Sequence, residues 1–454
     1  MRISFTRAVL RSAVPALLVA MSGFSALPAQ ASSESPYRVL HTYCSKAKCA
    51  DGAVGEGMLA IDPNGNLFTV ANSGGAREGG TLSELTPNTS GSKYAFHRVK
   101  HFCNPGGCAT GGQPMSGPIL DTAGNLYGTT SNYGNRQCGT VFMATPASTT
   151  PGAAKATMHV LHAFNGYDGC NPYFGRLAYQ GEESRAPYDG TSPLFGMTNA
   201  GGYKGRGVVF ELTPPASGKD KWHERLLYSF CNLTNCADGQ FPQGNLTMDS
   251  SGNLFGGTTD GKIFELTPAN NGRYSYRVIY TSTTSEAYAQ ITVESNGTLI
   301  GVADAGGSAN MGTLFSLSPN ICRACNARDV SYQYTLLHDF CLGGLPCTDG
   351  YLPGSFVLDA VGNIFGTTFA GGANPAPPGF INYTGAGVVF RYFTSGDFAV
   401  IHNFCSEANC ADGGMPLGGL TRDNALNLYG TTSAGGSTTN TDSGAGVVYQ
   451  LEPR

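Results

Sequence analysis

The stretch DTAGNLYGTT, Asp121 to Thr130, begins with a turn rich in Asp, Gly and Asn that lies between two apolar runs. Such a turn is the strongest short-range sequence signal for a β-hairpin. Related stretches recur along the chain: DPNGNLF (from Asp62), DSSGNLF (Asp249), ESNGTLI (Glu294), DAVGNIF (Asp359), DNALNLY (Asp423) and a degenerate YDGTSPLF (Tyr188). These stretches predict an internal repeat, and a repeat decides the fold before any other feature does.

Two further segments accompany each hairpin. The first alternates β-branched or aromatic residues and often ends in Thr-Pro: GGTLSELTP, CGTVFMATP, RGVVFELTP, DGKIFELTP, MGTLFSLSP, AGVVFRYFT and AGVVYQLEP. The second comprises YRVLHTY, FHRVKHF, MHVLHAF, ERLLYSF, YRVIYTS, YTLLHDF and FAVIHNF. Both patterns are typical of strands, and neither has helical periodicity. Each unit of about 60 residues therefore contains four antiparallel strands.

Seven such units predict an all-β fold, a seven-bladed β-propeller. A β-helix is the alternative, but its coils are usually much shorter. The chain begins with an outer-type strand, Tyr37–Tyr43, and closes with a third-type strand, Gly446–Leu451. We expect these two segments to pair, so that the N-terminal strand completes the last blade and no strand edge stays exposed.

The second unit, GNLYGTTSNYGNRQCGTVFMATP, and the last, GNLYGTTSAGG…GAGVVYQLEP, resemble the GloVer (Gloeo/Verruco) tandem repeat of exported bacterial proteins. The resemblance covers essentially the whole chain after its N-terminal segment. It is strong in six units and degenerate around Pro193–Phe195. It implies a secreted propeller and supplies no catalytic residues to carry over. Members often carry a C-terminal cell-surface anchor, which we expect this chain to lack.

Residues 1–31 have the pattern of a signal peptide. MRISFTRAVLR carries three arginines and no acid, an apolar stretch follows, and AQA (29–31) is a small-residue cleavage signal. We expect residues 32–454 to form a single propeller domain that is secreted or periplasmic. No later apolar stretch is long enough to span a membrane. The net charge of −4 and the 13% of charged residues provide no basic face for nucleic acid. We expect a monomer without cofactor or metal.

Fourteen cysteines in an exported chain predict disulfides. Five pairs share one local setting and should each close on themselves: Cys44/Cys49, Cys103/Cys108, Cys231/Cys236, Cys341/Cys347 and Cys405/Cys410. Such short loops contribute only about 2 kcal/mol each, so they hold loops in shape. Cys138 and Cys170 should pair with each other. Cys322 and Cys325 favour a local disulfide over a metal site, because no second pair of ligands lies nearby.

Propeller topology places these disulfide-closed links on the same face as the glycine-rich loops between the second and third strands. We call it the stapled face and expect binding there, since stiffened loops on a rigid scaffold usually carry function. An Asp before Gly recurs in the links: Asp51, Asp168, Asp238, Asp349 and Asp412. These are turn residues that bond their own backbone, or a ring of acceptors for sugar hydroxyls. They are too far apart to share one ion.

Other candidates for ligand contact on this face are Tyr133, Arg136, Tyr173, Tyr203, Lys204, Arg206 and Tyr351. Tyrosine offers a flat face with a polar tip, which suits stacking on sugar rings. His41, His162, His338 and His402 occupy one aligned place in the outer strands, where packing is the expected role. No nucleophile motif such as GxSxG is present.

The functional hypothesis is an extracellular binding module whose ligand is a glycan or a cell-surface protein. The alternative is a carbohydrate-active enzyme on the same scaffold, a polysaccharide lyase or a glycoside hydrolase. A lyase would need a cation for the uronate carboxylate, and Arg136, Lys204 and Arg206 are the candidates on the stapled face. A third possibility is a repeat scaffold that binds nothing small.

Overall fold

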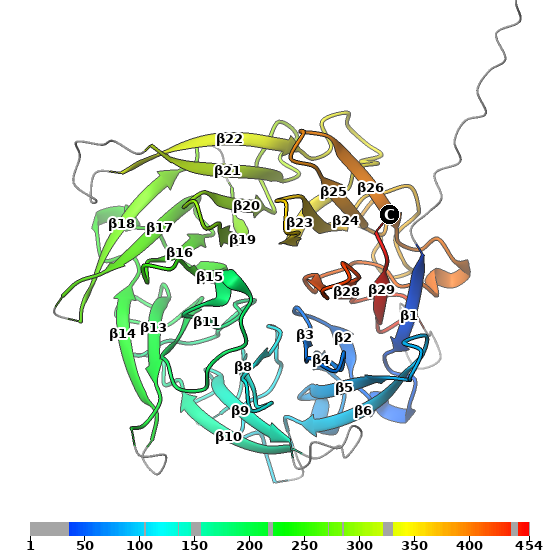
Figure 1. Cartoon of the computed structure of the whole chain (residues 1–454), viewed down its shortest axis with the longest axis horizontal. Coiled ribbons are helices and arrows are strands. Elements are labelled where there is room, and N and C mark those ends of the chain that lie inside the picture. The colour runs from blue at the N-terminus through cyan, green and yellow to red at the C-terminus, as the bar shows by residue number, and fades with distance from the viewer. Residues whose placement is uncertain are drawn as a thin grey trace, which may run out of the picture. The chain divides into compact units, whose positions relative to one another are not determined.

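The computed structural model describes residues 36–103, 106–134, 136–146, 156–216, 221–270, 272–283, 286–320, 330–436 and 444–453. Within them, seven antiparallel sheets surround a central axis (Figure 1), as predicted for a seven-bladed β-propeller. Cys322 and Cys325 lie outside the described residues. None of the helices found in these ranges is long and apolar enough to cross a membrane.

The strands fall into four classes by their distance from the axis. The innermost are β2 (Ala53–Gly55), β3 (Ala60–Ile61), β7 (Ile119–Leu120), β11 (Ala178–Tyr179), β15 (Pro242–Met248), β19 (Tyr288–Val293), β23 (Tyr351–Leu358) and β27 (Thr421–Arg422). The second are β4 (Leu67–Ser73), β8 (Leu126–Thr130), β12 (Leu194–Thr198), β16 (Leu254–Thr258), β20 (Leu299–Ala303), β24 (Ile364–Ala370) and β28 (Leu428–Thr431).

The third strands are β5 (Thr81–Pro87), β9 (Thr140–Pro146), β13 (Val208–Thr213), β17 (Lys262–Pro268), β21 (Thr313–Asn320), β25 (Val388–Tyr392) and β29 (Val447–Leu451). The outermost are β6 (Tyr94–His101), β10 (Ala156–Ala163), β14 (His223–Ser229), β18 (Tyr274–Thr281), β22 (Ser331–Asp339), β26 (Phe398–Asn403) and β1 (Tyr37–Thr42). Single 3₁₀ turns are η1 (Ala47–Cys49), η2 (Ala76–Glu78), η3 (Glu182–Ser184), η4 (Thr234–Cys236) and η6 (Ala408–Cys410).

The glycine of the NLYG motif lets the blade interior pack closely. A Cβ on Gly128 would lie 2.8 Å from the Phe142 ring, which crosses over it from β9. The same relation joins Gly196 to Phe210 and Gly301 to Phe315. Second and third strands are buried on both faces, which explains their nearly continuous apolar sequence. The hydrophobic core lies between neighbouring blades.

The Asp that opens each hairpin turn organises the turn. Asp121 Oδ1 accepts hydrogen bonds from the backbone N–H of Ala123 (2.9 Å) and of Asn125 (2.7 Å), and Oδ2 accepts one from Asn125 Nδ2. These bonds explain why Asp and Asn occur four residues apart in the motif. The same pattern recurs at Asp62, Asp249, Asp359 and Asp423.

The ring closes as the phase of the repeat predicts. β1 pairs antiparallel with β29, with Tyr37 opposite Leu451 and Thr42 opposite Val447, and Figure 1 shows the two strands side by side. The last sheet thus has the order β1-β29-β28-β27. The Tyr37 ring also stacks on His402 of the preceding blade, with 4.1 Å between centroids.

Among the described residues, a repeated backbone hydrogen bond, which we call the latch, joins neighbouring blades at six of the seven junctions. At the start of β23, the Leu352 N–H donates to the carbonyl of Met311 in the preceding blade (2.8 Å), although Leu352 has φ +55°. Gly312 then packs on Pro353 of the same strand. Equivalent N–H donors with positive φ are Val54, Gln113, Asn171, Phe241 and Met415. Because a left-handed conformation is costly for these residues, the repeated bond must compensate for it.

The connection between β11 and β12 lies on the face of the hairpin turns and crosses the end of the central axis there. Glu182 Oε1 accepts a hydrogen bond from the Met248 N–H (2.7 Å) in the fourth blade. The Arg185 guanidinium donates to the Leu358 carbonyl in the sixth blade. A segment from the third blade therefore reaches across the ring and covers this end of the axis.

We expect Gly312→Ala to lower the free energy of unfolding by at least about 1–2 kcal/mol, the usual cost of a left-handed conformation for a residue with a Cβ. Gly312 has φ +109°, and its Cβ would lie 2.3 Å from Pro353 Cδ and 2.7 Å from the Ala303 carbonyl oxygen. Denaturant unfolding measures the change. The matched control is Gly343→Ala in the nearby link, where a Cβ meets nothing within 4 Å. Equal stability of the two variants would contradict the latch.

Candidate functional site

Six disulfides join described residues, and all six were expected from the sequence. They are Cys44–Cys49, Cys103–Cys108, Cys138–Cys170, Cys231–Cys236, Cys341–Cys347 and Cys405–Cys410. The links that carry them contact the glycine-rich loops of the same face. The Gly75 N–H donates to the Cys49 carbonyl (2.8 Å), and the Gly372 N–H donates to the Cys347 carbonyl (2.8 Å). In these blades, the disulfide-closed link and the glycine-rich loop of the stapled face are therefore joined by a backbone hydrogen bond.

The link that contains the Cys103–Cys108 disulfide differs at one repeated position from the links of the other four local pairs. Its disulfide to Cys103 is present, and the Cys108 carbonyl accepts a hydrogen bond from the Gly134 N–H (3.1 Å), as in the other links. However, Thr110 stands where the other local links have the Asp before Gly. The Thr110 hydroxyl donates to the Phe102 carbonyl (2.6 Å). The pairing of Cys103 with Cys108 is thus confirmed, and in this link a hydroxyl takes the place of the carboxylate.

The Asp of the remaining links is turned into its own loop. Asp51 is fully buried, and its carboxylate accepts hydrogen bonds from the backbone N–H groups of Ser45 (3.1 Å) and Lys46 (3.2 Å) and from the Ser45 hydroxyl (2.7 Å). Asp238 and Asp412 are equally buried and bonded. Asp168 and Asp349 are partly buried. The carboxylates thus hold the links in shape, and the three buried ones are not available as a ring of acceptors for a ligand.

Four of these carboxylates are each in contact with a histidine of an outer strand. The Nε2–Oδ2 distances are 3.3 Å for His41–Asp51, 3.2 Å for His162–Asp168, 2.9 Å for His338–Asp349 and 3.6 Å for His402–Asp412. Burial alone would raise the pKa of the Asp51 carboxyl, but the His41 and Ser45 side chains and the backbone N–H groups together lower it to about 2. The four histidines therefore help the link Asp residues to hold the links in shape. The sequence analysis missed this pairing of His with Asp.

A cavity of about 390 Å³ lies on the axis, and every blade contributes to its lining. Its polar side chains are Glu56, Ser116, Arg176, Gln243, Asn245, Gln290, Asp304 and Ser355, and its aromatic ones are Tyr173, Phe174, Phe369 and Tyr383. Most of these residues lie in the innermost strands or in the segments that lead from the links into them. The cavity therefore belongs to the stapled face.

Glycines bring the inner segments close enough to enclose this cavity. A Cβ on Gly244 (φ +77°) would lie 2.0 Å from the Ala289 carbonyl oxygen of the next blade. A Cβ on Gly57 (φ +86°) would lie 2.4 Å from the Gly117 backbone nitrogen. Backbone thus packs directly on backbone around the axis, and the larger side chains between these glycines face the cavity.

Two acids in the axial cavity have raised pKa values. Burial raises the pKa of the Glu56 carboxyl from its ordinary value of 4.5 to about 8. Burial also raises the pKa of Asp304 to about 6, although a hydrogen bond with Gln243 acts in the opposite direction. Burial and the nearby Glu56 raise the pKa of the Tyr173 hydroxyl. Clustered acids of raised pKa in a cavity mark a candidate functional site.

Two residues that line the cavity each carry a buried polar atom without a partner among the described residues. Glu56 Oε2 and Arg176 Nε are buried without a hydrogen bond. Leaving a buried polar group unpaired costs about 1–3 kcal/mol. A ligand that supplies the missing partners would recover this free energy.

The other candidates from the sequence are scattered over the stapled face. Of that set, only Tyr173 lines the axial cavity. Tyr351 is buried and accepts a hydrogen bond from the Thr384 N–H (3.0 Å), and the Arg206 guanidinium lies over the Phe241 ring. Tyr133 is half-buried, whereas Arg136, Tyr203 and Lys204 are exposed. The structure does not bring these residues together.

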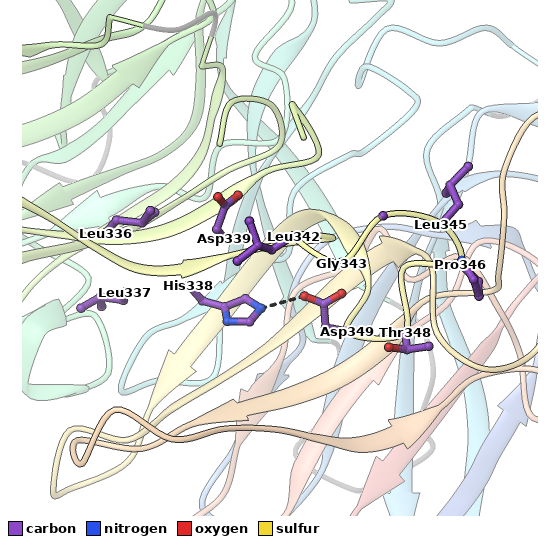
Figure 2. A pocket seen from close by; sticks show the side chains of 11 residues that line it. Leu336, Leu337, His338, Asp339, Leu342, Gly343, Leu345, Pro346, Thr348 and Asp349 are labelled. Atoms are coloured by element: carbon purple, nitrogen blue, oxygen red, sulfur yellow. Dashed lines mark hydrogen bonds and ion pairs between the residues drawn. The ribbon is translucent and has the colours of Figure 1, made fainter. Parts of the chain in front are cut away.

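A second hollow, of about 590 Å³, lies beside the link between the fifth and sixth blades. Figure 2 shows it between the end of β22 and the Cys341–Cys347 loop, with the His338–Asp349 hydrogen bond in its wall. Leu342 and Leu345 are exposed there by 68% and 64%. One strand and one loop build this hollow, and it has no unpaired buried polar side-chain atom among the described residues. The axial cavity is therefore the stronger candidate.

The repeat agrees with a known family. The family model described as the Gloeobacter/Verrucomicrobia repeat matches residues 152–376 and 259–454, which together span residues 152–454. The chain belongs to this repeat family. No curated protein matches the sequence.

Solved structures share the fold of this Gloeobacter/Verrucomicrobia repeat protein at low identity. A streptogramin B lyase has a TM-score of 0.53 and 13% identity, over 94% of this chain and 100% of that one. Virginiamycin B lyase from Staphylococcus aureus has a TM-score of 0.52 and 11% identity, over 92% and 100%. The extracellular domain of a putative hybrid two-component system from B. thetaiotaomicron has a TM-score of 0.50 and 10% identity, over 92% and 40%. At such identities these likenesses show the fold alone.

We expect the buried acid Glu56 to make stability fall as the pH rises. Its folded pKa of about 8 exceeds the ordinary 4.5, so its favourable protonated state is fully present below about pH 4.5 and is lost as the pH rises through about 8. Glu56→Gln should therefore gain stability relative to the parent across this range, as measured by denaturant unfolding at several pH values. Glu294→Gln, at a hairpin turn of the opposite face, is the control. Parallel curves for parent and Glu56→Gln would refute a buried, neutral Glu56.

Proposed function

We propose that this repeat protein is an exported binding module that holds an extracellular glycan on its stapled face, with one sugar residue in the axial cavity. The observation that carries the proposal is the combination, in one cavity, of aromatic rings with buried polar groups that lack partners. Binding sites for small ligands are mostly apolar cavities of about 300–1,000 Å³ with a few placed polar groups.

Sugar chemistry fits this lining. The C–H face of a pyranose ring packs on aromatic side chains, for which Tyr173, Phe174 and Tyr383 are available. Its hydroxyl groups both donate and accept hydrogen bonds. They can therefore satisfy the protonated Glu56 carboxyl and the Arg176 guanidinium, each of which has an unpaired buried atom.

Export is supported by two independent features. Residues 1–31 carry the charge pattern, apolar stretch and small-residue cleavage signal of a signal peptide. Six disulfides join described residues, and disulfides persist in oxidising compartments. One fold neighbour is named as an extracellular domain, which is in keeping with the same location.

An enzyme acting on a polysaccharide is the second candidate, and the favouring observation is that Arg176, Tyr173 and two acids line one cavity. In a lyase, the Arg176 guanidinium would neutralise a uronate carboxylate and the ionised Asp304 carboxylate would take the proton beside it. The glycosidic C–O bond would break as the double bond forms, and the Tyr173 hydroxyl would protonate the leaving oxygen. In a hydrolase, Glu56 and Asp304 would serve as the two carboxyl groups, since their raised pKa values differ. Neither role is needed for binding.

A glycan array with the purified protein, followed by titration of the best oligosaccharide, tests the proposal. We expect Arg176→Gln to weaken binding by about tenfold or more, because a hydrogen bond to a charged group is worth about 1.5–3 kcal/mol. Tyr173→Ala should weaken it similarly. The matched control is Tyr203→Ala, at a tyrosine that is 78% exposed and outside the cavity.

The outcomes separate the candidates. Equal binding by Tyr173→Ala and Tyr203→Ala would refute the axial cavity as the glycan site. Release of ultraviolet-absorbing unsaturated sugars from a polyuronate would identify a lyase, and release of saturated reducing ends would identify a hydrolase. An array without any bound glycan would overturn the glycan proposal and leave a surface protein as the ligand to seek.

A further inference from the structure

A packing rule holds at five of the seven junctions between neighbouring outer strands. A His or Tyr of one outer strand stacks on an aromatic ring of the next. The stacked pairs, with their centroid distances, are His41–Phe96 (3.7 Å), Tyr228–Tyr276 (3.7 Å), Tyr280–Tyr334 (4.9 Å), His338–Phe398 (3.8 Å) and His402–Tyr37 (4.1 Å).

The junction between the second and third blades breaks this rule with a carboxylate. Glu224 lies opposite Leu212 of β13, just as Phe96 lies opposite Leu85 and Tyr276 lies opposite Leu266. The strand register therefore places Glu224 where the other junctions have a ring. Its neighbour across the junction is His162, the aligned histidine of β10.

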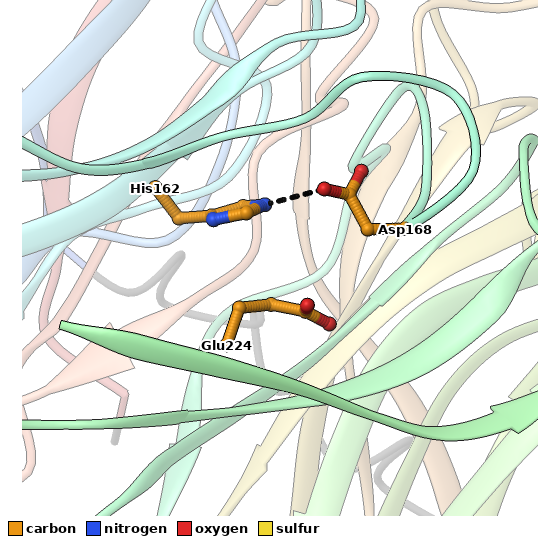
Figure 3. Close-up of side chains that lie close together, drawn as sticks. All are labelled: His162, Asp168 and Glu224. Carbon is orange, nitrogen blue, oxygen red and sulfur yellow. Dashed lines mark ion pairs between the residues drawn. The ribbon is translucent and has the colours of Figure 1, made fainter.

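The presence of Glu224 in place of an aromatic ring brings together three side chains that can bind a metal ion. His162 Nε2, a carboxylate oxygen of Asp168 and one of Glu224 all lie within 4.8 Å of one another. Figure 3 shows the imidazole directed at Asp168, with the Glu224 carboxylate beside the same space. His162 Nε2 is 3.2 Å from Asp168 Oδ2, a separation that suits two ligands of one ion.

Neighbouring residues fix the orientation of two of these side chains, and the third has an oxygen without a hydrogen-bond partner among the described residues. Asn165 holds the Asp168 carboxylate through its backbone N–H (2.8 Å) and its Nδ2 (2.6 Å), and the Phe164 ring packs edge-on against His162 (4.9 Å). Such second contacts fix the direction of metal ligands. Glu224 Oε1 is buried and has no hydrogen-bond partner among the described residues.

We propose that His162, Asp168 and Glu224 bind one divalent transition-metal ion, for which Zn²⁺ is the best match. One imidazole and two carboxylates form a ligand set that zinc accepts, with a fourth position left for water. Calcium needs six to eight oxygen ligands, which this cluster does not supply. Since β10 and β14 belong to different blades, the ion ties them together at the junction that the Cys138–Cys170 disulfide also bridges.

The sequence analysis predicted no metal, and this proposal departs from that prediction. The ion considered there was a single one shared by the link carboxylates of several blades. Here one link carboxylate, Asp168, meets two outer-strand side chains at one junction. The site lies at the periphery and is independent of the glycan proposal for the axial cavity.

Calorimetric titration of the chelator-treated, desalted protein with ZnCl₂ tests the proposal. We expect one tight site per chain. Glu224→Gln should weaken it by at least about tenfold, the lower end of the loss typical even for residues that only support a ligand. The matched control is His338→Gln. His338 also pairs with an Asp, but its neighbour across the junction is the Phe398 ring and not a carboxylate. This substitution should leave the zinc affinity and the stoichiometry unchanged.

Glu224→Phe separates loss of the ion from loss of the fold. The substitution supplies the aromatic ring that the other junctions have, so we expect this variant to fold. Addition of Zn²⁺ should raise the melting temperature of the parent but not that of the variant. Equal zinc affinity in the parent and Glu224→Gln, or no zinc binding by the parent, would overturn the proposal.

Discussion

Pairing of β1 with β29 is the constraint on which the rest of the structure depends. It places Tyr37 opposite Leu451 and joins the two ends of the described chain in one sheet. An open array of these sheets would expose a strand edge at each end, and closure removes both. Closure also creates the axial cavity, because its lining needs side chains from every blade.

The repeated residues and the functional candidates occupy different parts of each unit. The repeated ones serve the scaffold: the Asp of the hairpin turn, the Asp of the link, and the Gly–Pro contact between blades each satisfy local backbone geometry. The cavity is lined by residues in which the units differ, such as Glu56, Arg176 and Asp304. Burying these groups costs free energy that the scaffold does not require, and this cost favours a functional role.

The blades, the closure and the disulfide pairs could be predicted because each follows from local rules. Period-two alternation predicts strands, an Asp–Asn turn predicts a hairpin, and cysteines five or six residues apart can reach only each other with ease. The Cys138–Cys170 pair, 32 residues apart, follows instead from the propeller topology, which places both residues on one face. The axial residues could not be found in this way. Glu56 lies between β2 and β3, and Arg176 lies just before β11, so neither follows the alternation of a strand. The direction of their side chains depends on how each blade is placed in the ring. A signal was present, since these segments follow the repeated link at a constant offset.

Glu224 shows the same limit in another form. In the sequence it is one more polar residue at the start of an outer strand. Only the register, with Glu224 opposite Leu212, reveals that it replaces an aromatic ring. The link Asp residues show the converse, since their repetition suggested a ring of ligand contacts. Full burial of Asp51, Asp238 and Asp412 instead assigns them to the loops.

The most direct test of the central claim is a crystal structure of the protein with a bound oligosaccharide. The account predicts that a sugar residue lies in the axial cavity, stacked on Tyr173 and within hydrogen-bonding distance of Glu56 and Arg176. A sugar seated elsewhere, such as in the hollow beside Leu342, with the axial cavity empty, would contradict it.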